Sequence, residues 1–319
     1  MLIAAAFAVV VTSILVLAGR GRAAGTRSWP RTSRDVIATA LLCTAAAPAA
    51  FRLASALSAS DVTVVGAGAA LVLGVGARAF VGPVRGLAVV TGVTTLVVVV
   101  DLIHRSARAS DASIAFGDGL EGITIGAALV AAGIVLDVTS DRRARVGVVT
   151  ALAAVATALV APALGGMTSA AVVAVPSFGV FGMIASGRRI TAPTVAIIVV
   201  VTAAVTGSIA VAGIAGADAG HPGLGIAERL DTALDLMLGT IWPVVIVVVP
   251  GALVLVAKLR PGVFDRAMWG QPALRAALIA AGVAAVLSVL TDERGLVAAA
   301  YIVVFGSVAA SVALLAPDG

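Results

Sequence analysis

The chain has 319 residues, of which 61% are hydrophobic and only 12% are charged, and its mean hydropathy is +1.16. Soluble domains carry about 25% charged residues, so this composition excludes an ordinary soluble globule, which needs more polar surface to cover its core. The net charge of +5 would suggest nucleic acid as the partner of a soluble protein. Here the distribution of the basic residues follows the topology of a membrane protein, and we expect no nucleic-acid partner.

Eleven apolar runs predict an all-α, polytopic transmembrane helical bundle. About 20 apolar residues cross the ~30 Å hydrocarbon core as a helix, and helices satisfy their backbone polar groups internally, as lipid requires. The runs also lack the alternation of a transmembrane barrel strand. In chain order, the predicted spans are 2–19, 35–51, 62–80, 86–104, 121–137, 146–164, 168–186, 191–216, 233–257, 273–290 and 295–316.

The first run, 2–19, differs from a signal peptide. Signal peptides carry positive charge before their apolar core, whereas here Arg20 and Arg22 follow it. We therefore expect a retained span that enters from outside. Residues 20–34 are predicted to form a basic cytoplasmic linker, and residues 1–319 to form a single integral membrane domain.

The basic residues support the same topology. With the N-terminus outside and the C-terminus in the cytoplasm, sixteen of the 21 Lys and Arg residues fall on the cytoplasmic side, and eleven of the 16 Asp and Glu residues fall on the outer side. This is the pattern of the positive-inside rule. Arg52 is counted among the few basic residues of the outer loops. The predicted location is a bacterial cell membrane, with the lipid bilayer as the first partner.

Two sequence features indicate how the spans pack. Gly66, Ala70 and Gly74 recur every four residues, which favours close approach of a neighbouring helix. Prolines lie inside or near several spans, and the ninth is interrupted by Trp242-Pro243 and Pro250-Gly251. Broken helices form binding sites in transporters, but proline and glycine are also common in ordinary membrane helices, so a kinked packing helix is the simpler interpretation.

Ionisable residues near the outer ends of spans are the candidate functional residues, because charge in lipid is costly. Asp101 and His104 lie on one face of the fourth span. The complete outer candidate cluster is Asp101, His104, Asp118, Asp218, His221, Asp235 and Asp292. It could hold a divalent cation or a cationic group, or be a solvated loop surface. No metal-ligand motif or nucleotide loop is present, and Cys43 is the only cysteine, so we expect no cofactor.

Four stretches carry a resemblance to a known family: residues 100–118, 164–190, 221–236 and 289–295. The second includes Val175-Pro176-Ser177-Phe178-Gly179, and the fourth includes Asp292 and Gly295. In these stretches the chain resembles the C-terminal multi-span membrane half of large actinobacterial proteins that carry an N-terminal alkaline-phosphatase-like or sulfatase-like domain. The motifs are altered in places, for example at Gly166-Met167-Thr168-Ser169.

The resemblance implies a membrane-anchoring or complex-forming subunit in cell-envelope metabolism, with an extracytoplasmic phosphatase-like or sulfatase-like protein as its partner. It transfers no catalytic residue, and we expect no enzymatic activity from this chain alone. Two alternatives stay open: a transporter or flippase, supported by the many spans and the broken ninth one, and a membrane-embedded glycosyl- or phospho-transferase that uses the outer acidic residues.

Overall fold

The computed structural model describes residues 31–56, 61–108, 119–139, 141–160, 168–188, 190–211, 270–291 and 295–315, with seven isolated residues between 247 and 268. All regular structure in these ranges is helical. The helices are α2 (Arg31–Ala56), α3 (Val62–Val81), α4 (Pro83–Arg108), α5 (Leu120–Val138), α6 (Arg142–Val160), α7 (Thr168–Ala185), α8 (Ala192–Val211), α12 (Pro272–Thr291) and α13 (Gly295–Leu315). They match nine of the predicted spans in order, while span 2–19 and most of span 233–257 lie outside the described residues.

Seven of the described helices are long and apolar enough to cross a membrane: α2, α3, α4, α5, α6, α12 and α13. The apolar parts of α7 and α8 are shorter, at Ala170–Ala185 and Ala192–Gly207. The helical and apolar character predicted from the sequence is therefore confirmed for this part of the chain. The total of eleven spans stays a prediction.

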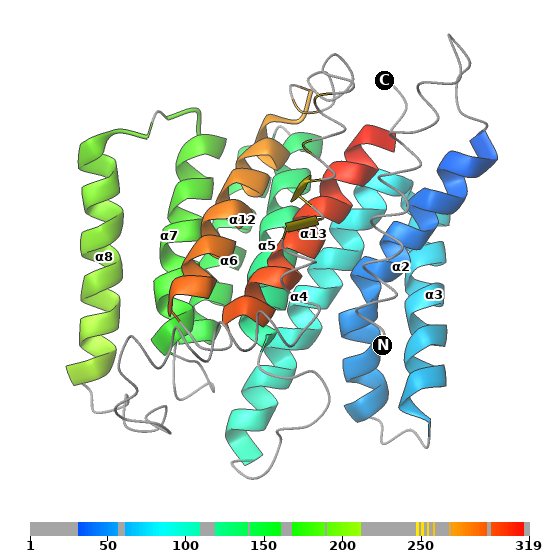
Figure 1. Ribbon diagram of the computed structural model, residues 1–319, viewed down its shortest axis with the longest axis horizontal. Coiled ribbons are helices and arrows are strands. Elements are labelled where there is room, and N and C mark those ends of the chain that lie inside the picture. The colour runs from blue at the N-terminus through cyan, green and yellow to red at the C-terminus, as the bar shows by residue number, and fades with distance from the viewer. Residues whose placement is uncertain are drawn as a thin grey trace.

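Figure 1 shows the helices side by side, with α8 at one edge of the bundle and α2 and α3 at the other. Helix α5 packs against α4, α12 and α13, and both α5 and α13 are buried along most of their length. Helices that are apolar all round belong in the interior of a bundle. By contrast, α3, α6 and α8 expose large apolar residues such as Val72, Val149 and Val200, a surface compatible with contact with lipid.

Small residues set the distances between neighbouring helices. Gly66, Ala70 and Gly74 are the buried residues of α3, and a Cβ at Gly66 or Gly74 would meet Phe51 or Cys43 of α2. The predicted close-packing face is thus confirmed. Helix α5 also has a glycine at a close helix contact, because a Cβ at Gly122 would overlap the backbone of Ala298 in α13. Glycine allows the helix backbones to approach where a side chain would keep them apart.

Three helix starts lie three or four residues before the predicted ones, including that of α4, which begins at Pro83 instead of residue 86. Helix α2 begins at Arg31, so it includes the last four residues of the predicted linker 20–34. Helix α6 begins at Arg142, although Arg142, Arg143 and Arg145 were predicted to lie in a loop. In α6 the reason is a cap, since Asp141 Oδ1 accepts a hydrogen bond from the backbone N–H of Arg143 at 3.1 Å. Asp at this position satisfies free N–H groups and starts the helix before the apolar run.

The start of α12 is capped by a different helix. Asp137, near the end of α5, accepts hydrogen bonds from the backbone N–H groups of Ala273 at 2.9 Å (Oδ1) and Leu274 at 2.7 Å (Oδ2). Pro272 precedes them at the first helical position, where its missing N–H costs nothing. The carboxylate also carries negative charge to the positive end of the helix dipole. This contact fixes the end of α5 to the start of α12.

We predict that Asp137→Asn lowers the free energy of unfolding by about 1–2 kcal/mol, because an amide offers only one acceptor oxygen to the two N–H groups. Asp141→Asn is the matched control, since Asp141 caps α6 through a single oxygen and asparagine is an equally good cap. Unfolding in mixed micelles measures both. Equal losses in the two variants would contradict a two-oxygen cap at Asp137.

Candidate functional site

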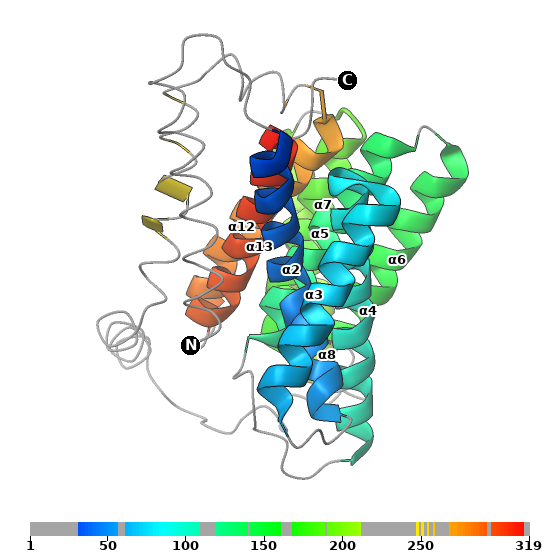
Figure 2. The ribbon, with the colours of Figure 1, turned by 90° about the vertical axis from the view of Figure 1, so that its right-hand side faces the viewer.

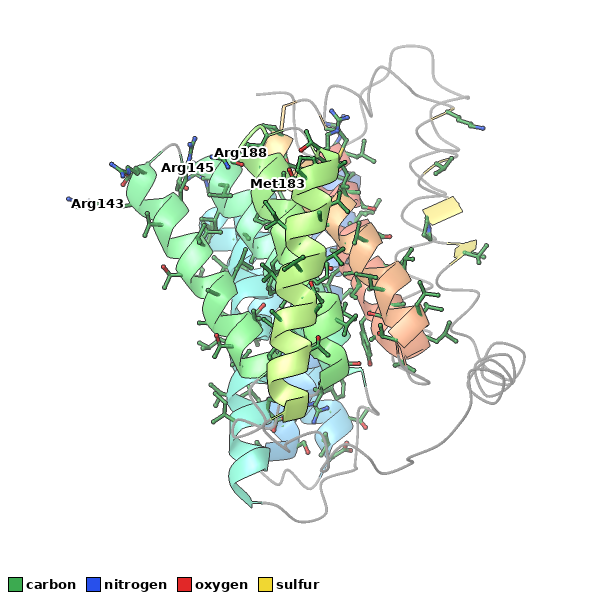
Figure 3. All side chains as sticks on the ribbon, turned by 90° about the vertical axis from the view of Figure 1, so that its left-hand side faces the viewer. Arg143, Arg145, Met183 and Arg188 are labelled. Atoms are coloured by element: carbon green, nitrogen blue, oxygen red, sulfur yellow. The ribbon has the colours of Figure 1, made fainter. Side chains whose placement is uncertain are left out.

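The charged side chains separate between the two ends of the bundle. Antiparallel neighbours bring the start of α2 to the end of α3, and the end of α5 to the start of α12. Among the described side chains, the resulting arginine-rich end carries Arg34, Asp35, Arg78, Arg85, Asp137, Asp141, Arg142, Arg143, Arg145, Arg188 and Arg275. Figure 3 shows three of these arginines, at 143, 145 and 188, together at that end. The opposite end carries Arg52, Asp61, Asp101 and Glu121.

At the opposite end, α2 and α4 are joined by an ion pair. Arg52 Nη1 donates to Asp101 Oδ2 at 3.1 Å. The Arg52 side chain is only 4% exposed, and that of Asp101 is 23% exposed. Arg52 was predicted to lie in an outer loop just after a span, whereas α2 continues to Ala56 and buries it. A charge at this depth requires a partner of opposite sign, and Asp101 supplies it.

The helix period explains why these two residues meet. Thr94 Oγ1 of α4 donates to the carbonyl oxygen of Ala45 in α2 at 3.1 Å. Asp101 follows Thr94 by seven residues, and Arg52 follows Ala45 by seven residues. Seven residues are close to two helical turns, so each pair lies on one face of its helix. The two contacts therefore form a single polar seam between α2 and α4, and Figure 2 shows these helices close together.

Two buried residues of the next helices complete the site. Tyr301 of α13 lies within electrostatic range of the Arg52 guanidinium, and its ring covers Gly119, where a Cβ would lie 2.9 Å from the ring carbons. Glu121 is buried in the first turn of α5, where the helix dipole favours a negative charge. We use the name polar cluster for the four polar side chains Arg52, Asp101, Glu121 and Tyr301 at this end of the bundle, of which Arg52 and Asp101 are in direct contact. Its four helices contact one another in a ring: α2 with α4, α4 with α5, α5 with α13, and α13 with α2.

The structure describes little of the predicted outer candidate cluster. Asp101 lies in the polar cluster. His104 follows one turn later in α4, and its side chain is outside the described part. Asp118, Asp218, His221, Asp235 and Asp292 lie outside the described residues. Within the part of the chain that the structure describes, no group of three or more His, Cys, Asp or Glu residues could hold a metal ion.

Sequence reasoning missed three members of the polar cluster. Arg52 was assigned to an outer loop, and Glu121 and Tyr301 fall within the predicted spans 121–137 and 295–316 but were not among the candidate residues. A signal for Arg52 is present, because Leu53 and Ala54 continue the apolar run beyond it. An arginine with apolar residues on both sides predicts a buried cation that needs an acidic partner. Asp101 is the acidic residue of the parallel neighbouring span.

The described fold defines a class of protein, an apolar helical bundle with an arginine-rich end and a buried polar cluster at the other end. Comparison with models of known families, with curated proteins and with solved structures gives no match. The chemistry of the described residues and the family resemblance are therefore the grounds for a functional proposal.

Proposed function

We propose that the chain is a multi-pass subunit of a bacterial cell membrane that anchors or assembles a complex of cell-envelope metabolism. In this proposal the arginine-rich end faces the cytoplasm, as the positive-inside rule requires. The polar cluster then lies at the outer side, where an extracytoplasmic partner would dock. The resemblance to the membrane half of phosphatase-like and sulfatase-like fusion proteins supports a hydrolase as that partner.

One observation carries the proposal: both described ion pairs and the carboxylate cap at Asp137 connect different helices. Arg52 and Asp101 join α2 to α4. Arg78 of α3 pairs with Asp35 of α2 and donates to Thr39 Oγ1 at 3.0 Å. Asp137 joins α5 to α12. Contacts of this kind hold one arrangement of helices, which suits a scaffold that presents a fixed surface to a partner.

A transporter or flippase requires its ionisable residues to be placed differently. Carriers place ionisable residues along a substrate path and change their partners or protonation during the cycle. A transferase that used Asp101 as a base would need its carboxylate to be available to substrate, whereas Arg52 holds that carboxylate in an ion pair. Both alternatives are therefore weaker for the described helices than a structural role.

We predict that affinity purification from native membranes in a mild detergent recovers a second protein in stoichiometric amount, with an extracytoplasmic phosphatase-like or sulfatase-like domain. Mass spectrometry of the eluate identifies it, and an unrelated multi-pass protein with the same tag is the control. A chain that purifies alone in several detergents, and that supports substrate-dependent flux in vesicles, would replace the scaffold with a transporter.

A further inference from the structure

An apolar groove lies at the edge of the bundle between α7, α8 and α12. Its volume is about 540 Å³, and its walls include Val180 of α7, Val199 and Ala203 of α8, and Leu287 of α12. Helix α8 packs mainly on α7, through contacts such as Gly179 with Ile198. Among the described helices only α7 packs closely on α8, and the groove lies on the side of α8 toward α12.

The groove offers almost no polar atoms to an occupant. Thr202 and Thr206 line it, but their hydroxyls donate to backbone carbonyl oxygens of α8 itself, those of Ile198 at 2.8 Å and Thr202 at 2.9 Å. With these donors satisfied inside the helix, the wall is a surface of methyl and methylene groups. An occupant that matches it is a hydrocarbon.

The length of the groove matches an acyl chain in one leaflet. The α8 residues that line the groove run from Val195 to Thr206, which at 1.5 Å per residue is a length of about 16 Å. One leaflet contributes about half of the ~30 Å hydrocarbon core, so the groove has the depth of one leaflet.

One arginine lies close in sequence to the end of the groove. Ile190 lines it, and Arg188 lies two residues earlier with an exposed side chain. The turn that places Arg188 is fixed: Gly187 has φ of +71°, its N–H donates to Ile184 O at 2.9 Å, and the N–H of Arg188 donates to Met183 O at 3.0 Å. This pattern of two hydrogen bonds around a left-handed glycine ends a helix in one geometry. Figure 3 shows Arg188 at the same end as Arg143 and Arg145.

We propose that this groove binds an anionic phospholipid of the leaflet at the arginine-rich end, with an acyl chain between α7, α8 and α12 and the phosphate at Arg188. The apolar walls supply the affinity for hydrocarbon, and the arginine selects a negative headgroup. The proposal is independent of the complex-subunit function, because it requires no protein partner.

Native mass spectrometry of the detergent-purified chain tests the headgroup. The probes are phosphatidylglycerol and phosphatidylcholine with identical acyl chains. We expect phosphatidylglycerol to bind more tightly, and Arg188→Gln to weaken its binding about fivefold, the effect of one basic residue at a lipid surface. Phosphatidylcholine binding should not change. Arg85→Gln, which removes an exposed arginine at the start of α4, is the control and should leave both lipids unaffected. Equal binding of the two lipids, or equal effects of the two arginine variants, would overturn the proposal.

A second pair of variants tests the groove itself. Ala203 and Ala204 are neighbouring, exposed alanines of α8, and only Ala203 lines the groove. Ala203→Phe fills the groove and should abolish specific binding of both lipids, whereas Ala204→Phe should retain it. If Ala203→Phe changes the oligomeric state instead of lipid binding, the groove holds a protein segment and the proposal is wrong. The same conclusion follows if both phenylalanine variants bind lipid equally.

Discussion

Asp101→Leu should lower the free energy of unfolding of the bundle by about 3 kcal/mol, because it leaves the Arg52 guanidinium buried without its carboxylate. Arg52→Leu should cost less, since the remaining Asp101 carboxylate is 23% exposed and water can reach it, whereas Arg52 is 4% exposed. Unfolding in mixed micelles of a mild detergent and dodecyl sulfate gives both values. The ion pair requires that Asp101→Leu lowers the free energy of unfolding more than Arg52→Leu does.

The double variant Arg52→Leu/Asp101→Leu separates pairing from packing. Replacing a buried ion pair by apolar residues of similar size is often nearly neutral, so we expect the double variant to be more stable than Asp101→Leu alone. The double-mutant cycle should then give a coupling free energy of at least about 1 kcal/mol between Arg52 and Asp101. Additive losses would show that the pair does not hold α2 to α4.

Gly122→Ala should lower the free energy of unfolding by at least about 2 kcal/mol, because overpacking in a close-packed interior forces backbones apart. The added Cβ would lie inside van der Waals contact of the Ala298 carbonyl and Cα. Those are backbone atoms, which cannot rotate away as a side chain can. Helices α5 and α13 would have to separate, and both lie at the centre of the bundle.

Gly282→Ala is the matched control for this substitution. Gly282 lies within α12, and a Cβ there meets nothing within 4 Å. Alanine has a higher helix propensity than glycine by about 1 kcal/mol, so this variant should be as stable as the wild type or more stable. If Gly122→Ala behaved like Gly282→Ala, the close approach of α5 to α13 would be incorrect.

The helices could be predicted from the sequence because each is a long apolar run bounded by charged, glycine or proline residues. The predicted span 62–80 and helix α3 (Val62–Val81) differ by one residue, and span 273–290 differs from α12 (Pro272–Thr291) by one at each end. The larger differences, at α2, α4 and α6, occur where a helix continues past the apolar run into arginines. Hydropathy does not report such extensions, whereas caps such as Asp141 do.

Helix packing could be predicted only where the spacing of small residues within one helix indicated it. Gly66, Ala70 and Gly74 show their spacing within α3, and the structure confirms their role. Gly122 and Gly126 have the same four-residue spacing in α5 and were missed, although the signal was equally clear. Which helix each glycine face would meet depends on tertiary contacts between distant segments, and a single sequence does not contain them.

The candidate site was less predictable than the fold. The pairing of Arg52 with Asp101 joins residues 49 positions apart, and it depends on α2 and α4 lying side by side in one register. The seven-residue spacing that connects it to the Ala45–Thr94 contact becomes visible only when both helices are in place. Sequence patterns gave the acidic half of the pair, because a lone carboxylate in an apolar span is conspicuous. They did not give its partner.

The proposed function depends on which end of the bundle faces the cytoplasm, so the most direct measurement is the labelling of single cysteines in intact cells. Thr63→Cys places a thiol at the start of α3, at the opposite end, and Ser186→Cys places one after α7, at the arginine-rich end. Cys43→Ala removes the native thiol from both. The account predicts that a membrane-impermeant maleimide labels the Thr63→Cys chain in intact cells, and the Ser186→Cys chain only after the membrane is opened. Labelling in the reverse order would contradict the orientation, and with it an outer partner docked at the polar cluster.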